Sequence, residues 1–510
     1  MPSNRWAVVA GLLLLAAASC DHASAGPAAD AFAAATKAPP LLRAFLYRMP
    51  KGGDLHNHLS GAAYAEANIR AGGDAGGCVD PATAKMVFVT PCAPPNRPLA
   101  DAKTDAALNR VLVNAWSMRD FMPSSGNSGH DHFFAAFALF GGAAPMGDMA
   151  AEVVNRAGRQ QMRYIELMAT FQSRELVKLA EAVTKEQPWT WDGDLNAYEA
   201  TLMRAGLGDL AKHASAEIDG VEQRLRTVLQ CGTPLAEPGC RMTVRWLQQV
   251  SRAASPAMVF AQTLFGGLLQ AGDKRVVGLD YVAPEDNPNA LAHYTAQMHM
   301  LDYLHRRMPA SNVSLHAGEL TMGLVRPEEL LFHIREAVEI GHAKRIGHGV
   351  DVMYEDRPFA LLKDMAQRRV AVEVNLTSNA IILGVKGADH PFPIYRSYGV
   401  PVVLSTDDEG VERIDRTHEL QSAVTTYGLS WTALIGLERN TLEYAFVEGA
   451  SLWADPVAWR RIPVCSGADT TAKPAGACAA FLDKSEKARL QWAFEADLIR
   501  FDREIAAEHR

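Results

Sequence analysis

Eight short apolar segments, each ending in polar or ionisable residues, constrain the fold of this chain more than any other feature. Most of them are continuously apolar rather than alternating, which is typical of parallel strands buried on both faces. Stretches with helical spacing separate them. Eight strands that alternate with helices predict a closed (β/α)₈ barrel, or TIM barrel, although an open doubly wound sheet fits the same pattern. The segments cover residues 53–59, 162–168, 242–248, 275–282, 313–319, 345–350, 370–377 and 400–406.

Two stretches do not fit a minimal barrel. Residues 65 to about 112 follow the first predicted strand, contain several glycines and prolines, and are too long for an ordinary strand-to-helix connection. They predict an inserted subdomain closed by Cys78 and Cys92. Residues 451–510 form a C-terminal extension with a charged, helix-like stretch. The barrel itself is predicted over 49–450, after an N-terminal helical segment at 27–48.

The first twenty residues resemble an export signal. Arg5 precedes an apolar run at 8–18 that is too short to span a bilayer as a mature helix. Small residues directly before Cys20 resemble a bacterial lipoprotein cleavage site, with plain signal-peptidase cleavage near residues 23–25 as the alternative. We therefore expect an exported chain, periplasmic or held in the bacterial envelope by a lipid on Cys20, with no other contact with a membrane.

The other six cysteines fall into three pairs that are close in sequence. An oxidising compartment would allow each pair to form a disulfide. Six cysteines permit fifteen connectivities, so pairing between neighbours is a prediction, and unpaired thiols are the alternative. The predicted pairs are Cys78 with Cys92, Cys231 with Cys240, and Cys465 with Cys478.

Charge argues against a nucleic-acid partner. The 510 residues carry a formal net charge of −8, and no basic stripe offers a surface for phosphates.

Two clusters of histidine lie at the predicted ends of the first and fifth strands. His56 and His58 are two residues apart, so on a strand their side chains face the same way and can reach one metal ion. His316 supplies a third imidazole, and Glu319 follows it past a glycine that lets the backbone turn over the barrel mouth. Active sites of (β/α)₈ barrels lie at these carboxyl ends.

Two further clusters complete the set. His348 stands between two glycines near the end of the sixth strand, which makes it a better site histidine than core histidine. Asp407 and Asp408 follow the eighth strand, where buried acids are costly unless a cation lies beside them. Three histidines and one aspartate, far apart in sequence, predict an open catalytic metal site. Nitrogen and oxygen ligands without thiolate suit one Zn²⁺ per chain, with Fe²⁺ or Mn²⁺ as alternatives.

The motifs and their order resemble the adenosine deaminase family of zinc amidohydrolases, over roughly residues 40 to 450. The similarity is strongest to the secreted adenosine deaminase-related growth factors, which also carry an export signal, a disulfide-bearing insert after the first strand, and a Trp-x₄-Phe stretch like Trp116 to Phe121. The matching motifs are His56-Asn57-His58, Gly278-Leu279-Asp280, His316-Ala317-Gly318-Glu319, Arg345-Ile346-Gly347-His348-Gly349, Thr377-Ser378-Asn379, His390-Pro391 and Thr406-Asp407-Asp408.

The resemblance implies a metal site and a proton donor. His56, His58, His316 and Asp407 would bind one zinc ion, with Asp407 also counted among the catalytic residues. Glu319 would protonate the ring nitrogen next to the amino-bearing carbon of a purine, which requires a raised pKa.

The resemblance also implies contacts with water and substrate. His348 would orient the attacking water and take part in its deprotonation. Asp408 would hydrogen-bond the imidazole part of the purine. Ser60, Gly318 and Ala283 would be further substrate contacts, although Ser60 stands where the family commonly has an aspartate that contacts the ribose. After the paired acids, Glu409 stands where the family frequently has a proline.

These roles predict hydrolytic deamination of adenosine or 2′-deoxyadenosine to inosine or deoxyinosine. The departure at Ser60 keeps other 6-aminopurines open, such as adenine or a 5′-modified or N6-substituted adenosine. A barrel kept as a binding or growth-factor-like protein is an alternative of another class. By resemblance, the insert and the N-terminal helix are candidate surfaces for a homodimer.

Overall fold

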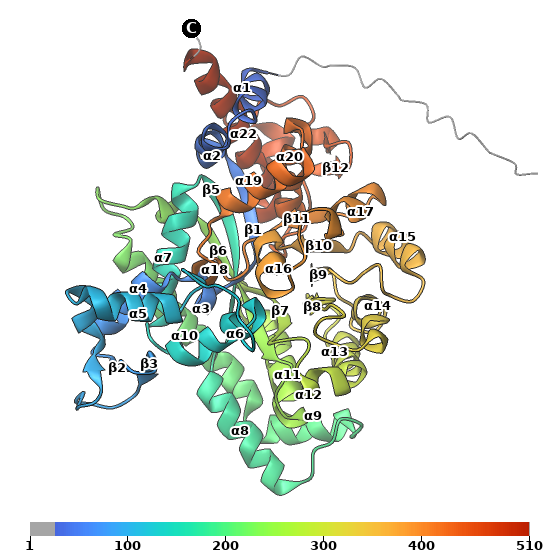
Figure 1. Ribbon diagram of the computed structural model, residues 1–510. Coiled ribbons are helices and arrows are strands. Elements are labelled where there is room, and N and C mark those ends of the chain that lie inside the picture. Colours follow the sequence, from blue (N-terminus) through green and yellow to red (C-terminus); the bar gives the residue numbers. More distant parts are fainter. Residues whose placement is uncertain (1–25, 509–510) are drawn as a thin grey trace, which may run out of the picture.

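The computed structural model describes residues 26–508, and its centre is a closed barrel of eight parallel strands (Figure 1). Hydrogen bonds join the strands in two runs, β1-β5-β6-β7 and β8-β9-β10-β11. Bridges between Leu279 and Val313 and between Asn57 and Asp407 join the runs at both edges and close the barrel. Each predicted segment overlaps one strand, so the barrel prediction is confirmed. The strands are β1 (Lys51–His58), β5 (Met162–Ala169), β6 (Thr243–Ser251), β7 (Val276–Val282), β8 (Ser314–Ala317), β9 (Arg345–His348), β10 (Ala371–Val374) and β11 (Val402–Leu404).

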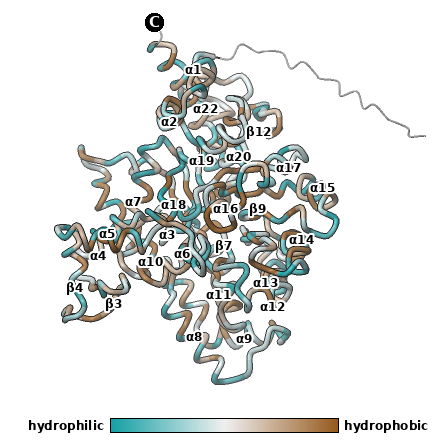
Figure 2. The backbone as a smooth tube through the Cα atoms, in the orientation of Figure 1, coloured by the Kyte–Doolittle hydropathy of each residue, from teal (hydrophilic) through white to brown (hydrophobic). Residues whose placement is uncertain are grey.

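Helices surround the barrel and shield its strands from water. Along α7 (Met146–Arg159) and α8 (Ser173–Glu186), hydrophobic and hydrophilic residues alternate from turn to turn (Figure 2). This pattern is typical of helices that pack one side against a core and expose the other. α11 is apolar on nearly all sides, because it packs between β6, β7 and neighbouring helices. The main covering helices are α7 (Met146–Arg159), α8 (Ser173–Glu186), α10 (Leu207–Val228), α11 (Pro256–Gly272), α13 (Tyr294–Arg307), α14 (His333–Glu339), α15 (Pro358–Arg368), α17 (Phe392–Ser397), α19 (Arg416–Tyr427) and α20 (Trp431–Glu443).

Shorter elements complete the connections between strands and helices. Several of them follow the carboxyl ends of strands and so contribute residues to the barrel mouth. They are α3 (Leu59–Ala62), α9 (Leu195–Arg204), η2 (Pro238–Arg241), α12 (Pro288–Ala292), η3 (Pro327–Leu330), α16 (Leu376–Ile382), η4 (Gly387–Asp389) and α18 (Glu409–Glu412).

The segment between β1 and α7 has a hydrophobic core of its own. Ile69, Val79, Leu112, Trp116 and Phe133 belong to this second core, which reaches past residue 112 into α6. A disulfide between Cys78 and Cys92 closes its small antiparallel sheet. We call residues 65–140 the insert. Its elements are α4 (Ala65–Asp74), β2 (Cys78–Asp80), β3 (Lys85–Val87), β4 (Arg97–Pro98), η1 (Leu99–Lys103), α5 (Ala106–Ala115) and α6 (Gly129–Phe140).

The two ends of the described chain lie side by side (Figure 1). α1 (Pro27–Ala35) packs on α22 (Glu486–Glu508), and α2 (Pro39–Arg48) packs on α19. The rest of the C-terminal extension contains β12 (Trp453–Asp455), β13 (Arg460–Arg461), η5 (Pro463–Cys465) and α21 (Gly476–Asp483).

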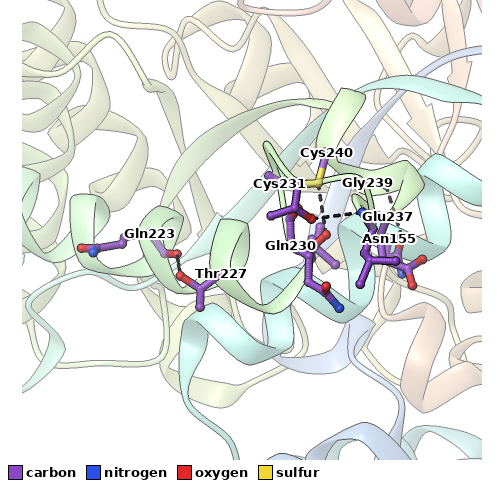
Figure 3. The surroundings of a disulfide bond; sticks show 11 residues. Asn155, Gln223, Thr227, Gln230, Cys231, Glu237, Gly239 and Cys240 are labelled. Atoms are coloured by element: carbon purple, nitrogen blue, oxygen red, sulfur yellow. Dashed lines mark hydrogen bonds between the residues drawn. A yellow bond between two sulfur atoms is a disulfide. The ribbon is translucent and has the colours of Figure 1, made fainter.

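All three predicted disulfides are present, which confirms pairing between cysteines close in sequence. Cys231 and Cys240 join the end of α10 to the loop before β6 (Figure 3), and Cys465 and Cys478 join η5 to α21. The predicted export signal and Cys20 lie outside the described residues. Within residues 26–508, no helix is both long and apolar enough to cross a lipid bilayer.

Candidate active site

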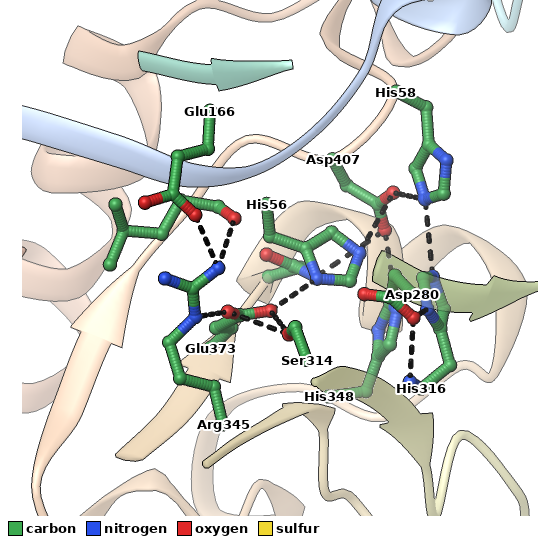
Figure 4. Close-up of polar contacts among 12 residues, drawn as sticks. His56, His58, Glu166, Asp280, Ser314, His316, Arg345, His348, Glu373 and Asp407 are labelled. Carbon is green, nitrogen blue, oxygen red and sulfur yellow. Dashed lines mark hydrogen bonds and ion pairs between the residues drawn. The ribbon is translucent and has the colours of Figure 1, made fainter. Parts of the chain in front are cut away.

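Three histidines and one aspartate converge at the carboxyl ends of the strands (Figure 4). His58 Nε2 lies 3.1 Å from His316 Nε2 and 3.4 Å from Asp407 Oδ1. His56 Nε2 lies 3.6 Å from the same Asp407 oxygen. All four side chains are buried. The structure therefore brings together four groups that come from β1, β8 and the end of β11.

The other ring nitrogen of each imidazole is bound by a residue from a different strand. The contacts are His56 Nδ1 with Glu373 of β10 at 2.7 Å, His58 Nδ1 with Gln249 of β6 at 2.8 Å, and His316 Nδ1 with Asp280 of β7 at 2.8 Å. Because the Nδ1 atoms are engaged, the Nε2 atoms face one shared space. Partners of this kind orient the histidine ligands of metal sites.

These groups fit a metal ion. The candidate ligand atoms of His56, His58 and His316 lie within 4.8 Å of one another, as do those of His56, His348 and Asp407. His56 Nε2 is buried and has no hydrogen-bond partner within the described part of the chain. Buried polar atoms normally have partners, and a cation would supply the missing one. Nitrogen and oxygen donors without thiolate are the set expected for a catalytic site.

A buried charged network holds Glu373 in place. Arg345 donates from Nη2 to Glu166 at 2.5 Å and from Nε to Glu373, and Ser314 Oγ donates to Glu373 at 2.9 Å. Glycine is required at position 347, because a Cβ there would lie 2.7 Å from His56 Cε1. The orientation of His56 therefore depends on groups from β5, β8, β9 and β10.

Glu319 is held at the cavity by its backbone. Its amide donates to Glu285 at 2.8 Å, and the amide of Gly318 donates to the same carboxylate at 3.1 Å. Gly318 has φ +73°, and a Cβ there would lie 2.3 Å from Asp351 Oδ1, so only glycine fits this turn. Burial, with the charges of Asp407 and Glu285, raises the pKa of Glu319 well above its usual range. The carboxyl group is thereby kept protonated and able to donate.

A chain of hydrogen bonds fixes the tautomer of His348. The amide of Phe392 donates to His390 Nδ1 at 3.0 Å, so neutral His390 carries its proton on Nε2 and donates to Asn379 Oδ1 at 3.0 Å. Asn379 Nδ2 then donates to His348 Nδ1 at 2.9 Å. Burial lowers the pKa of His348 well below its usual range. Neutral His348 therefore carries its proton on Nε2, which faces Asp407 at 3.6 Å.

These residues line a cavity of about 340 Å³ at the barrel mouth. Its charged and polar side, which we call the floor, comes from the barrel. Its opposite side, which we call the roof, is apolar and comes mainly from α6 of the insert. The floor consists of His58, Ser60, Gln249, His316, Glu319, His348, Asp407 and Asp408, and the roof of Phe133, Phe134, Phe137 and Ile382. Ala283 also lines the cavity.

Three non-glycine residues of this cavity have left-handed backbones. The φ angles are 68° for His348, 58° for Asp407 and 83° for Ala283. Such conformations cost free energy and cluster at functional sites, where the surrounding structure enforces them. They are consistent with a site rather than an incidental hollow.

Comparison with known proteins agrees with this geometry. The model of the adenosine deaminase family matches residues 211–451. Adenosine deaminase of Escherichia coli strain SMS-3-5 is 36% identical over 137 residues, and that of strain SE11 gives the same values. The matched region covers 27% of this chain and 38% of either relative. The region from residue 211 to residue 451 is therefore similar to the adenosine deaminase family.

Solved structures support the same fold. The N6-mAMP deaminase MAPDA of Arabidopsis has 20% sequence identity and a TM-score of 0.51, over 79% of this chain and 96% of that one. Arabidopsis ADAL complexed with IMP has 19% identity and a TM-score of 0.53, over 90% of this chain and 99% of that one. The more specific resemblance to the secreted growth factors stays a prediction.

The predicted substrate contacts lie only partly at the cavity. Ser60, Ala283 and Asp408 line it. Gly318 is not among the lining residues, and its amide is bound to Glu285, so its predicted contact with substrate stays a prediction. Burial and the charges of Asp407 and Glu319 raise the pKa of Asp408 well above its usual range, which makes it a protonated donor.

Glu409, which replaces a frequent proline of the family, does not line the cavity. Its carboxylate accepts from Arg156 Nη2 at 2.9 Å and from Asn57 Nδ2 at 3.3 Å. This departure therefore anchors the loop after β11 to α7 and β1, and it leaves the floor unchanged.

Sequence reasoning missed the residues that support the floor. Glu373 is a single acid inside the apolar strand β10, and a buried charge of this kind needs a partner, which is a signal that could have revealed it. Glu285 and Gln249 carry no comparable signal. The roof was also missed, although Ser128 and Asp131 form a capping box, which predicts the start of the helix α6 that carries the phenylalanines.

Proposed function

We propose that this chain is a zinc-dependent hydrolase that deaminates 6-aminopurines, with adenosine and 2′-deoxyadenosine as its preferred substrates. One observation carries the proposal: three imidazole nitrogens and a carboxylate meet in the wall of a cavity that also contains Glu319 and His348. The similarity of residues 211–451 to the adenosine deaminase family supports it. The activity assigned to this chain remains a proposal, because the matched region spans 38% of the curated relatives.

His56, His58, His316 and Asp407 would hold the zinc ion. A zinc ion in such a site acts as a Lewis acid and makes water a strong nucleophile near neutral pH. The conversion of adenosine to inosine needs addition of water to the amino-bearing carbon and loss of ammonia, and the two protons of the water end on the adjacent ring nitrogen and on the departing amino group.

The chain's own residues provide the proton and the orientation. Protonated Glu319 donates to the ring nitrogen beside the attacked carbon, which makes the ring a better electron acceptor. His348 presents its Nε2 proton to the oxygen of the attacking water, so this tautomer orients the water and does not accept its proton. Asp408 is also protonated, so it donates to the acceptor nitrogen of the purine's five-membered ring. The aromatic roof excludes water and gives the base an apolar face on which to pack.

Charge in the cavity favours nucleosides over nucleotides. Among the described residues that line it, none is lysine or arginine, while three are carboxylic acids. A phosphate monoester carries close to two negative charges and needs cationic donors. The structural relatives include an N6-mAMP deaminase and ADAL complexes with GMP and with IMP. We propose that this chain differs from them in taking an uncharged substrate.

A neighbouring cavity favours a second candidate, a 5′-modified adenosine. This cavity of about 640 Å³ shares Ser60 and Gln249 with the active-site cavity. Arg174 and Glu175 of α8 also line it. A nucleoside with a large 5′ substituent could place its base over the floor and its substituent in this second space, past the small side chain of Ser60.

A substrate panel tests both candidates. Purified, zinc-loaded enzyme is incubated with adenosine, 2′-deoxyadenosine, adenine, 5′-methylthioadenosine, N6-methyladenosine and AMP. Loss of the adenine absorbance band and release of ammonia (methylamine from the N6-methyl substrate) are followed. We expect the highest kcat/KM for adenosine or deoxyadenosine and the lowest for AMP. A higher kcat/KM for 5′-methylthioadenosine would favour the second candidate, and turnover of none of them would overturn the proposal.

We also propose that the chain acts outside the cytoplasm, anchored through a lipid on Cys20. The predicted signal and the three short-range disulfides support this, because disulfides persist in oxidising compartments. Mass spectrometry of the N-terminus of protein purified from bacterial envelopes checks it. A diacylated Cys20 is the expected result.

A further inference from the structure

A second cavity, of about 570 Å³, lies at the end of the barrel opposite the active site. Lys344 directly precedes β9, whereas His348 of the active site ends it, so the two cavities are separated by the length of the strand. We call this second cavity the basal cavity. Most of its ionisable lining residues are basic: His305, His342, Lys344, Arg368, Arg369 and Lys487. On a chain with a net charge of −8, this concentration of positive charge is local.

Three of the basal cations lack a counter-charge. Within residues 26–508, Lys344, Arg369 and Lys487 form no ion pair with a carboxylate. Their hydrogen bonds go to neutral oxygens. Lys344 donates to Asn312 Oδ1 at 2.6 Å, Lys487 to the carbonyl of Glu443 at 2.8 Å, and Arg369 to the hydroxyl of Tyr444.

The acid of the basal cavity offsets only part of this charge, because Glu443 raises the pKa of Lys487 but forms no ion pair with it within residues 26–508. Glu443 is the one carboxylate among the described lining residues. Its Oε2 accepts from Ser451 at 2.6 Å and from Gln491 at 2.9 Å. Elsewhere in the lining, His342 lies 2.9 Å from Asp302, and Arg368 lies 3.0 Å from Asp364. Among the described cations of the cavity, those without an ion-pair partner are therefore Lys344, Arg369 and Lys487.

Electrostatics within the fold disfavour this arrangement without a ligand. Burial lowers the pKa of Lys344 and of Lys487. For Lys487, the charges of Glu443 and Glu166 offset part of this effect, and those of Arg345 and Lys344 add to it. Partly buried cations close to one another raise the free energy of the folded state. A bound anion would offset both the desolvation and the mutual repulsion.

We propose that the basal cavity binds a small molecule that carries phosphate groups. Ammonium and guanidinium groups from three separate elements surround the space: the start of β9, the turn before β10, and the start of α22. Such donors suit an anion with several negative oxygens better than a single carboxylate. The volume exceeds that of one phosphate ion and lies in the range of cavities that hold metabolite-sized ligands. The site is independent of the proposed deaminase activity.

Isothermal titration calorimetry tests this proposal directly. Fructose 1,6-bisphosphate is the probe, inorganic phosphate is the minimal probe, and fructose is the matched neutral control. We expect one saturable site per chain for the bisphosphate, weaker binding of phosphate, no binding of fructose, and lower affinity as salt rises. Lys344→Glu should weaken binding of the bisphosphate at least about tenfold, because one charged donor is replaced by a repelling group.

Lys363→Glu is the matched charge control, because Lys363 is exposed on α15 and does not line the basal cavity. It should bind the bisphosphate as the parent does. Lys344→Gln, which removes the charge without reversing it, should be intermediate. Thermal unfolding of each variant verifies folding. The proposal is wrong if the parent shows no saturable binding, if Lys344→Glu binds like the parent while folded, or if Lys363→Glu weakens binding equally.

Discussion

The floor and the roof of the active-site cavity are built on different principles. The histidine ligands of the floor are each fixed by a second residue, as His58 is by Gln249 and His316 by Asp280, and these partners come from other strands of the barrel. The roof is a cluster of phenylalanines on one helix, α6, which packs on the separate core of the insert. The floor therefore sets the chemistry, and the roof sets which substrates reach it.

The largest expected effect on kcat comes from a substitution in the floor, at Glu319. Glu319→Gln keeps the shape of the side chain but cannot deliver a proton, so kcat for the proposed deamination should fall about 10²–10⁴-fold. Zinc content, measured by atomic absorption, should stay at the parent level. Glu328→Gln, an exposed change in the loop after Glu319, is the control and should be neutral. If kcat of Glu319→Gln equals that of the parent, Glu319 is not the proton donor.

The second largest effect on kcat is expected from a substitution that changes the tautomer of His348. In Asn379→Asp, a carboxylate oxygen replaces the amide donor at His348 Nδ1, so this nitrogen must carry a proton and the pKa of His348 rises. A group with a raised pKa is charged below that pKa, so activity that needs neutral His348 is lost on the acidic side of the profile.

We expect kcat to fall roughly 10²-fold, by analogy with other histidine tautomer changes, and the acidic limb of the pH profile to move to higher pH. Asn196→Asp, at an exposed position on α9, is the control. If a folded Asn379→Asp variant has an unchanged pH profile, the chain of hydrogen bonds does not set the tautomer of His348.

Roof variants should act on binding and leave the chemistry intact. Phe134→Ala removes an aromatic face that a purine would pack against, and such stacking contributes about 1–3 kcal/mol. KM should rise about tenfold, with kcat within about twofold of the parent and zinc retained. Phe88→Ala, an exposed change in the same insert, should leave KM unchanged. A large fall in kcat would show that α6 also organises the floor.

The smallest effect is expected at Ser60, where floor and neighbouring cavity meet. Ser60→Ala removes one hydroxyl available to the sugar, and a hydrogen bond of this kind contributes about 0.5–1.5 kcal/mol. kcat/KM for adenosine should fall a few-fold, whereas kcat/KM for adenine, which has no sugar, should not change. Equal falls for both substrates would place Ser60 against the base.

The sequence could predict the features that follow from the order of strands, helices and cysteines along the chain. Parallel strands bring their carboxyl ends to one edge, so the periodicity of eight apolar segments was enough to place His56, His316 and Asp407 together. The local cysteine pairs were predictable because short loops bring their ends close. These features depend on the order of elements along the chain, which the sequence displays.

Other features depend on contacts that the sequence does not display. Glu373 and Gln249 reach His56 and His58 across the interior of the barrel, and nothing in their spacing marks those pairs. The position of α6 over the cavity follows from how the insert packs against Ile382 and Val411, which is a tertiary contact. The extent of the insert's core past residue 112 has the same origin.

The insert begins and ends near the barrel mouth and keeps its own core and crosslink. Mutations that reshape α6 can therefore accumulate without disturbing the candidate metal ligands, Glu319 or His348. A lineage could explore new purines by drift in this one module, and an engineer could exchange it between family members to retarget a conserved reaction.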